Sequence, residues 1–361
     1  MSEIHPLNKL ADIEKWINNT ELKVEDIDNL INDETKEVRS HILKRLLTNY
    51  FSNKNTTTTT IYPLRIIGPV SISYLKSTKY NKYIIFLGDI HKPVNFKIFE
   101  EKVPNSMIID NWISSILSKN TKLIDIFVES GKYYEKFNDN LSINKFQNAL
   151  FDCFNDKNCS ARIHWVDVRR NIPELNTIAN FLRGYYKNKS VERLDDVKNI
   201  VKNLNLEEIL KYSRVYKQFE NVREDIYKKY MNKNEKFFER KYVDDILLNL
   251  VEDIEKAIIP ILNMLNFLMN FYTIGRMFKS FTCKSTEYCP EPTFIICYFG
   301  KNHTDDIKKF LKEELQFEET FNIDNTANLP IDEETGKPII EPTPVINIED
   351  LPQPLFSDVN L

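Results

Sequence analysis

Apolar residues recur along the chain with two different periods, and the change of period marks the elements that we expect. From residue 61 onward, short runs of β-branched and aromatic residues alternate with longer segments in which apolar residues return every three or four positions. The short runs read "LRIIGPVSISYLKS", "KYIIFLG", "KLIDIFVES", "ARIHWVDVRR" and "TFIICYFG". Strands that alternate with helices predict an α/β fold, with a mainly parallel sheet flanked by helices on both faces.

The same patterns divide the chain into segments. Helical spacing predicts an N-terminal helical arm over residues 1–52, followed by an Asn/Thr linker over 53–60. The α/β core is expected over 61–170 and 281–322. A large helical insertion with charged faces is expected between these two parts, over residues 171–280.

The last segment, residues 323–361, has a different composition. It holds six of the fifteen prolines, and eight acidic residues against a single lysine, which predicts a disordered acidic tail. Its end, "LPQPLFSDVNL", is expected either to bind a protein partner as a short linear segment or to act only as a solubilising tail.

Overall composition and charge exclude few classes of protein. The chain of 361 residues is 42% hydrophobic and 28% charged, with a net charge of −4 and no basic stripe or aromatic stacking motif, so we expect no nucleic-acid partner. The first residues lack the basic-then-apolar order of a signal peptide, which predicts a cytoplasmic location. Five cysteines then indicate reduced packing thiols, with a late-formed disulfide and a four-thiolate zinc site as alternatives.

The most apolar segment, residues 257–275, approaches the length of a membrane span. However, Asn263, Asn266 and Asn270 recur in it at helical spacing, and Pro260 interrupts it. We therefore expect a buried amphipathic helix here and no membrane span.

Two of the predicted strands end in the same motif, Gly-x-x-His. It occurs as Gly88–His91 in "YIIFLGDIH" and as Gly300–His303 in "IICYFGKNH". Seven glycines and five histidines predict about 0.1 such pairs by chance, so the repetition indicates a shared role. Ligands of parallel sheets bind at the carboxyl ends of strands, where glycine permits a tight turn and a close approach. We expect the two histidines to meet there, together with Glu129, Asp167 and Arg169 at the ends of two further strands.

The order of these motifs resembles a superfamily that includes the TraB/PrgY pheromone-shutdown proteins, the Tiki Wnt-cleaving proteins, ChaN and the erythromycin esterases. The match covers about a third of the chain and departs from the pattern at Asp89, where several members carry Glu or Thr. The resemblance implies a hydrolytic site for peptide or ester bonds, with an unknown small molecule or peptide as substrate. The whole chain is also similar in style to proteins of large eukaryotic DNA viruses, which adds a virion-associated location as an expectation.

For the site, the resemblance implies metal-dependent chemistry. The neutral imidazoles of His91 and His303 and the carboxylate of Glu129 would ligate a divalent ion such as Zn, Mn or Co. Asp89 would be a further ligand or a group that orients one. Such an ion lowers the pKa of water and creates a nucleophile near neutral pH. Without a metal, one histidine would act as general base, oriented by Glu129.

Two other strand-end residues would assist either reaction. Arg169 would stabilise developing negative charge or hold an anionic group of the substrate, and Asp167 would orient a reacting group. Each of these candidate site residues also has a structural explanation. These explanations are a turn at His91, helix capping around His303, and an ion pair between Glu129 and Arg169.

Two other interpretations of the chain stay open. A hydrolase-like fold that has lost its chemistry would serve as a scaffold or virion component. The sequence Asp89-Ile90-His91 also resembles the Asp-x-His of calcineurin-like metallophosphoesterases, although the Gly-Asp-x-x-Asp segment that supplies their bridging carboxylate is missing. His164, which alternates within its strand, is expected to be a packed histidine.

Overall fold

The computed structural model describes most of the chain from residue 63 onward. The described residues are 63–119, 123–130, 140–155, 161–169, 172–212, 224–279, 291–327, 329, 341–352 and 355–356. By its contacts the chain divides into two compact units, and all of these residues belong to the larger one. The predicted helical arm and linker, residues 1–60, lie outside the described residues.

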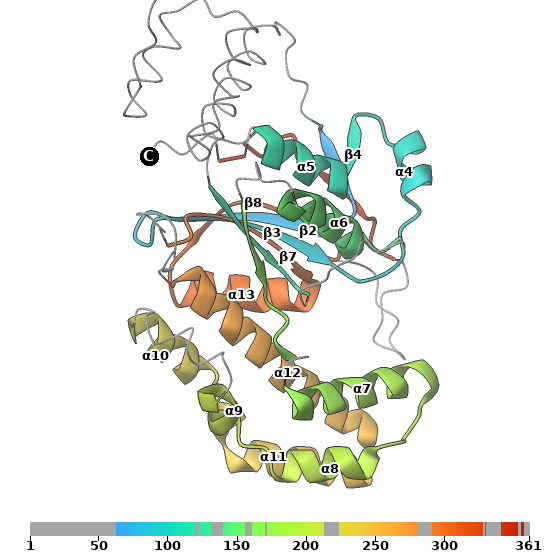
Figure 1. Cartoon of the computed structure of the whole chain (residues 1–361), viewed down its shortest axis with the longest axis vertical. Coiled ribbons are helices and arrows are strands. Elements are labelled where there is room, and N and C mark those ends of the chain that lie inside the picture. Colours follow the sequence, from blue (N-terminus) through green and yellow to red (C-terminus); the bar gives the residue numbers. More distant parts are fainter. Residues whose placement is uncertain are drawn as a thin grey trace, which may run out of the picture. The chain divides into compact units, whose positions relative to one another are not determined.

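A six-stranded sheet organises the larger unit (Figure 1). Its strands, in spatial order, are β6 (Ala161–Trp165), β5 (Ile124–Val128), β7 (Phe294–Gly300), β3 (Lys82–Asp89), β2 (Ser71–Ser77) and β8 (Glu318–Asp324). The first four are parallel to one another, whereas β2 pairs antiparallel with both β3 and β8. The predicted α/β fold with a mainly parallel sheet is therefore confirmed.

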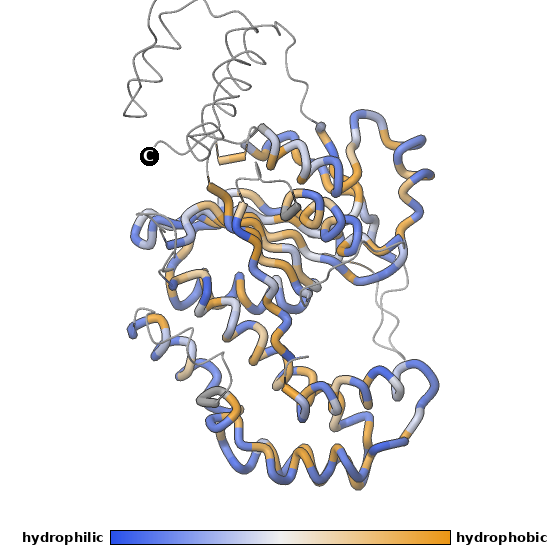
Figure 2. The backbone as a smooth tube through the Cα atoms, viewed as in Figure 1, coloured by the Kyte–Doolittle hydropathy of each residue, from blue (hydrophilic) through white to orange (hydrophobic). Residues whose placement is uncertain are grey.

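The last long apolar run of the sequence, β7, lies between β5 and β3. All seven of its residues are buried, as expected of a parallel strand covered on both faces. Figure 2 shows the central strands of this sheet as largely hydrophobic. In the register of the sheet, Asp89 lies opposite Gly300, and Val128 opposite Tyr298. The carboxyl ends of β3, β5, β6 and β7 consequently meet at one edge.

Helices cover both faces of this sheet (Figure 1). On one face lie α5 (Ile109–Lys119) and α6 (Ser142–Asn155), and on the other lie α12 (Ile254–Met277) and α13 (Lys301–Glu313). The helix α13 begins directly where β7 ends, so the second Gly-x-x-His motif forms a strand-to-helix junction.

A smaller sheet has the order β4-β1-β9, from β4 (Ser106–Ile108), β1 (Arg65–Ile67) and β9 (Val345–Asn347), with α4 (Phe96–Lys102) beside it. The run "LRIIGPVSISYLKS", expected to be one strand, is thus two strands in two sheets. The break falls at Gly68, whose φ of +140° suits only glycine and whose Cβ would lie 2.7 Å from Ser142 Oγ.

The helical insertion is confirmed. Its elements are α7 (Pro173–Asn188), α8 (Leu194–Lys202), α9 (Leu206–Tyr212), α10 (Glu224–Lys233), the 3₁₀-helix η4 (Glu235–Phe238), α11 (Arg240–Glu252) and α12. One buried cluster joins Phe86, Phe127 and Phe299 of the sheet to Leu268 and Phe271 of α12. The insertion therefore shares its hydrophobic core with the sheet.

Within the described residues, α12 is the one helix long and apolar enough to cross a membrane by length and composition. Its most apolar stretch is 67% buried inside the larger unit. That burial agrees with the core helix predicted from the asparagines in this segment.

The predicted disorder of residues 323–361 is wrong for the residues that the structure describes there. The strand β8 extends to Asp324, and β9 pairs antiparallel with β1. Further on, the Phe356 ring lies 5.0 Å from the Phe294 ring and 5.9 Å from the Tyr74 ring, measured between centroids. Leu355 is buried with it, so the described part of the end segment packs on the chain's own core.

The cysteines of the described part differ in state. Cys297 in β7 is a buried free thiol, and burial raises its pKa well above the ordinary range. Cys153 in α6 is disulfide-bonded. The expectation of reduced thiols therefore holds for Cys297, and the disulfide alternative applies at Cys153.

Candidate functional site

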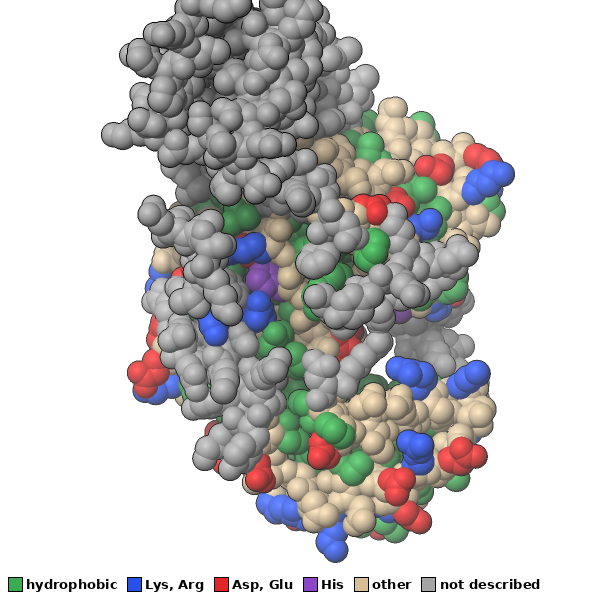
Figure 3. All heavy atoms as spheres, in the orientation of Figure 1, with side chains coloured by type: hydrophobic (Ala, Val, Ile, Leu, Met, Phe, Trp, Pro, Cys, Tyr) green, Lys and Arg blue, Asp and Glu red, His purple; other side chains and the backbone are tan. Residues whose placement is uncertain are grey.

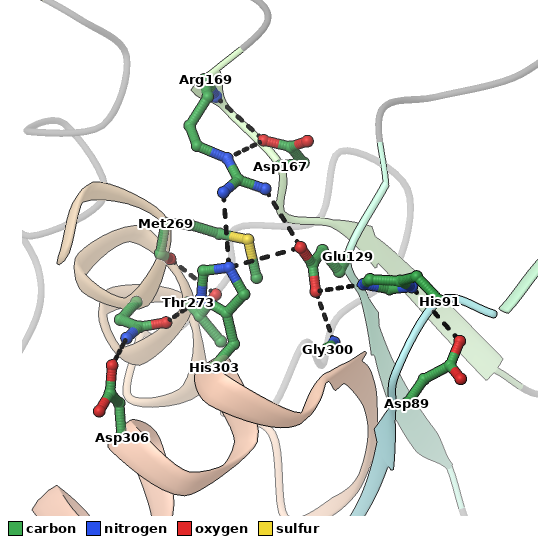
Figure 4. A network of polar contacts seen from close by, with 11 residues as sticks. Asp89, His91, Glu129, Asp167, Arg169, Met269, Thr273, Gly300, His303 and Asp306 are labelled. Atoms are coloured by element: carbon green, nitrogen blue, oxygen red, sulfur yellow. Dashed lines mark hydrogen bonds and ion pairs between the residues drawn. The ribbon is translucent and has the colours of Figure 1, made fainter. Parts of the chain in front are cut away.

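Four parallel strand ends bring the predicted residues together. His91 follows β3, Glu129 follows β5, Arg169 follows β6, and His303 lies in the first turn of α13 after β7. Because these strands are neighbours in the order β6-β5-β7-β3, their carboxyl ends form one continuous edge. Figure 4 shows the four side chains pointing toward one another, with Asp167 beside Arg169.

Glu129 is the centre of this site. Its Oε2 accepts a hydrogen bond from the backbone nitrogen of Gly300 at 2.5 Å and lies 3.6 Å from His91 Nε2. Its Oε1 lies 3.2 Å from Arg169 Nη2 and 3.4 Å from His303 Nε2. Burial alone would raise the pKa of Glu129, but His303, His91 and Arg169 hold it well below the ordinary value. The carboxylate is therefore ionised at neutral pH.

His91 lies at the rim of the site. Its Nδ1 is 3.3 Å from Asp89 Oδ2, and its side chain keeps 43% of its surface exposed. Burial lowers its pKa, but the contacts with Asp89 and Glu129 outweigh this and raise the pKa to about 10. The ring is thus an imidazolium at neutral pH in this arrangement. Its φ of +53° is rare for a residue other than glycine and marks local backbone strain.

His303 is held on the opposite side of Glu129 and has a 5% exposed side chain. Its Nδ1 lies 2.7 Å from Asn270 Oδ1, and its Nε2 lies 3.5 Å from Arg169 Nη1. The two histidines therefore share one arrangement, because each ring presents Nε2 to Glu129 and has an oxygen acceptor at Nδ1.

Arg169 links the remaining carboxylate to the centre. Its Nε donates to Asp167 Oδ1 at 2.8 Å, and its backbone nitrogen donates to the same oxygen at 3.3 Å. Burial lowers the pKa of the guanidinium, but Asp167 and Glu129 outweigh this and raise it. The guanidinium is thus fixed between Glu129 and His303 with its charge retained.

The two motif glycines have different neighbours, and neither has the left-handed backbone expected of a tight turn. At Gly300 an added Cβ would lie 2.8 Å from His91 Nε2 and 3.0 Å from Glu129 Oε2, so the site itself fills that space. At Gly88 the added Cβ would collide with Ser71 Oγ on the neighbouring strand β2. Close approach, and not turn geometry, is the reason for glycine at both positions.

Sequence reasoning missed Asn270, which comes from α12 of the helical insertion. It is 3% exposed, and its Nδ2 donates to Asp306 Oδ2 at 3.3 Å. The sequence held a signal for this residue, since a buried asparagine in an apolar helix needs a hydrogen-bonding partner. The sequence does not identify that partner. Asp89, predicted as a metal ligand or an orienting group, lies on the Nδ1 side of His91, where it can orient the ring.

His164, expected to be a packed histidine, belongs to a separate network. Its Nε2 lies 2.7 Å from Asp125 Oδ1, and its Nδ1 lies 2.9 Å from Arg276 Nη2. Burial lowers the pKa of His164 against the opposing effect of Asp125, so this ring is neutral. Figure 3 shows acidic and basic side chains spread over the described part of the face drawn. His164 lies outside the site and can therefore serve as a control histidine.

The donors at the centre are of the types that bind a divalent metal. Two ligands about 2.1 Å from a tetrahedral ion lie about 3.4 Å apart, and each histidine Nε2 lies at about this distance from Glu129. The two distances run to different oxygens of Glu129, 3.6 Å to Oε2 from His91 and 3.4 Å to Oε1 from His303. However, among the described residues no group of three or more His, Cys, Asp or Glu side chains has the arrangement of a formed metal site. The guanidinium of Arg169 stands next to these donors instead.

Comparisons of the chain with protein-family models, curated proteins and solved structures found no match. The geometry of the site therefore has to carry the functional conclusion.

Proposed function

We propose that the chain is a metal-dependent hydrolase of ester or peptide bonds, with its site centred on Glu129. The supporting observation is the shared arrangement of the two histidines. Each presents Nε2 to Glu129, and each has Nδ1 next to an oxygen acceptor, Asp89 for His91 and Asn270 for His303. Metal-binding histidines in proteins are oriented in this manner by an acceptor at the second nitrogen.

The charges of the site favour a cation. Three carboxylates, Asp89, Glu129 and Asp167, face one guanidinium and one imidazolium, which leaves a net charge of −1 if His303 is neutral. A buried excess of negative charge is costly unless a cation compensates it. Replacing the His91 proton by a divalent ion would bring the sum to zero.

In this proposal His91, His303 and Glu129 hold the ion, and Zn, Mn and Co match their imidazole and carboxylate ligands. The ion would supply a nucleophile from water near neutral pH and polarise the scissile carbonyl. Arg169 binds the oxygen that becomes negative during attack, since its guanidinium is already aimed at the centre by Asp167. The exposed rim at His91 gives a small molecule or a peptide access to the site.

A metal-free hydrolase is the related alternative. There, His303 Nε2 would take the proton of the attacking water, and the His91 imidazolium would give a proton to the leaving group. One observation favours a third reading, a scaffold without catalysis. The guanidinium of Arg169 already compensates Glu129, so the cluster can be a purely structural ion network.

Metal titration of the full chain distinguishes these functions. Stripped protein is loaded with Zn, Mn or Co and dialysed, and its metal content is measured by mass spectrometry. We expect one ion per chain in the wild type and a loss of binding in His91→Gln and His303→Gln. The matched control is His164→Gln, which changes a histidine outside the site and should keep the ion.

The same proteins are then assayed on lactones, aryl esters and fluorogenic peptides, together with Glu129→Gln. Metal-dependent hydrolysis that is lost in Glu129→Gln and kept in His164→Gln supports the proposal. Hydrolysis without any bound ion points to the acid–base alternative. Absence of both metal and hydrolysis in a folded wild type would leave the scaffold.

A further inference from the structure

The helical insertion reaches the site through the polar side chain of Asn270. Asn270 lies in α12, whose neighbouring residues are almost all buried and apolar. Its amide stands between His303 Nδ1, at 2.7 Å from Oδ1, and Asp306 Oδ2, at 3.3 Å from Nδ2. Figure 4 shows His303 and Asp306 projecting from α13 toward this part of α12, which also carries Met269 and Thr273. A buried amide with both ends bonded has a fixed orientation.

That orientation decides where the proton of His303 sits. The carboxylate of Asp306 is an acceptor, so the Asn270 amide turns its NH₂ group toward it. The amide oxygen then faces His303 and accepts a hydrogen bond from Nδ1–H. In a neutral imidazole with its proton on Nδ1, Nε2 carries the lone pair.

The other side of the ring faces both a donor and an acceptor. Arg169 Nη1 lies 3.5 Å from His303 Nε2, and Glu129 Oε1 lies 3.4 Å from the same nitrogen, so these two contacts together do not assign Nε2. The contacts at Asp306 and Asn270 place a proton on Nδ1, and a neutral ring then has its lone pair on Nε2.

We propose that Asn270 is a positioning residue that holds a proton on His303 Nδ1, so that the neutral ring has its lone pair on Nε2, the nitrogen beside Glu129. The helical insertion then contributes to the chemistry of the sheet edge through α12. The tautomer follows from the contacts alone. Its use as a metal ligand or a base rests on the proposed function.

The test reads the tautomer directly in the metal-free full chain. Protein labelled with ¹⁵N-histidine is studied by long-range ¹H–¹⁵N NMR near pH 8, and the His303 signals are assigned by their loss in His303→Gln. We expect a protonated Nδ1 and an unprotonated Nε2 in the wild type. In Asn270→Leu, which removes the acceptor at similar volume, we expect mixed tautomers or a shift to Nε2–H.

The matched control is Asn263→Leu, the same substitution at an exposed position of the same helix. It should leave the His303 signals unchanged. A second variant, Asn270→Asp, keeps an oxygen acceptor and should restore the proton on Nδ1. This variant separates an effect on the proton from a general disturbance of packing.

A wild-type spectrum with the proton on Nε2 would overturn the inference, whether or not Asn270→Leu folds. So would an unchanged tautomer in folded Asn270→Leu. In the metal titration, loss of such an orienting partner should weaken binding about 10- to 100-fold. If the wild type shows the expected tautomer and yet binds no metal and hydrolyses nothing, the proposed function fails and the role of Asn270 stands.

Discussion

The substitution Gly300→Ala separates the geometry of the site from the stability of the fold. The backbone at Gly300 has φ −55° and ψ 147°, which alanine adopts without strain. The added methyl group, however, would lie 2.8 Å from His91 Nε2 and 3.0 Å from Glu129 Oε2. Ordinary contacts of a Cβ begin at 3.4 Å, so the His91 ring has to retreat by 0.6 Å or more (3.4 − 2.8).

The free-energy cost of this retreat is small. The His91 side chain is 43% exposed, so loss of its ion pair with Glu129 costs about 0–1 kcal/mol after solvent screening. Alanine restricts the unfolded chain and returns about 0.4–1 kcal/mol. The free energy of unfolding should therefore change by less than about 1 kcal/mol. The pKa of His91 should nevertheless fall from about 10, since Glu129 is one of the two groups that raise it.

The assay combines urea unfolding with an NMR titration of the His91 ring. The control is Gly184→Ala in α7, where the nearest atom to the added Cβ is 3.8 Å away. That variant should gain about 0.5–1 kcal/mol of stability and leave the His91 pKa unchanged. A His91 pKa that stays near 10 in Gly300→Ala would refute the idea that the ring occupies the space above this glycine.

Three further predictions follow from individual contacts. Because the pKa of His91 is raised in the folded chain, the stabilising effect of this residue should be complete below pH 6.5 and lost as the pH rises through about 10. In urea unfolding, the difference in unfolding free energy between the wild type and His91→Gln should therefore shrink across that window. Glu129→Gln should cost about 2–3 kcal/mol at pH 7. Because the folded-state pKa of Glu129 is lowered, this difference should begin to shrink as the pH falls below the ordinary carboxyl pKa of 4.5 and should be lost as the pH falls through the lowered pKa; a difference that persists unchanged in acid would contradict the ion network. Phe356→Ala should cost about 3–5 kcal/mol in chemical unfolding, since this ring is 1% exposed, and a loss under 1 kcal/mol would mean that the end segment does not pack on the core.

Much of the fold could be predicted because its central strands are buried on both faces. Continuous apolar runs such as β7 stand out from the helical periodicity around them. The break at Gly68 was not visible, since the reason for it, the approach of Ser142, comes from a helix more than 70 residues away. The prediction of disorder at the end of the chain was wrong for a related reason. Prolines and acids dominate its composition, while β9 pairs with β1, which lies near the opposite end of the described chain.

The edge of the site was predictable from topology, and its inner arrangement was not. Parallel strands bring their carboxyl ends together, so His91, Glu129 and His303 could be expected at one edge without knowing the strand order. Which ring nitrogen faces Glu129 depends on contacts with Asp89 and Asn270 that only packing creates. The reason for glycine at position 300 likewise became visible only with the His91 ring in place.

The dependence on packing has a consequence for how the site forms. Its residues come from four strand ends. The strand β7 carries Gly300 and lies between β5 and β3 in the sheet, although it follows the whole helical insertion in the sequence. Asn270 reaches His303 only when α12 is seated on the same core as the sheet. No short segment of the chain therefore contains a partial site with its histidines oriented. The proposed metal binding and the proposed His303 tautomer should both disappear in the same cooperative transition as the fold. An oriented His303 in a chain whose insertion has been unfolded would show that α12 does not hold it.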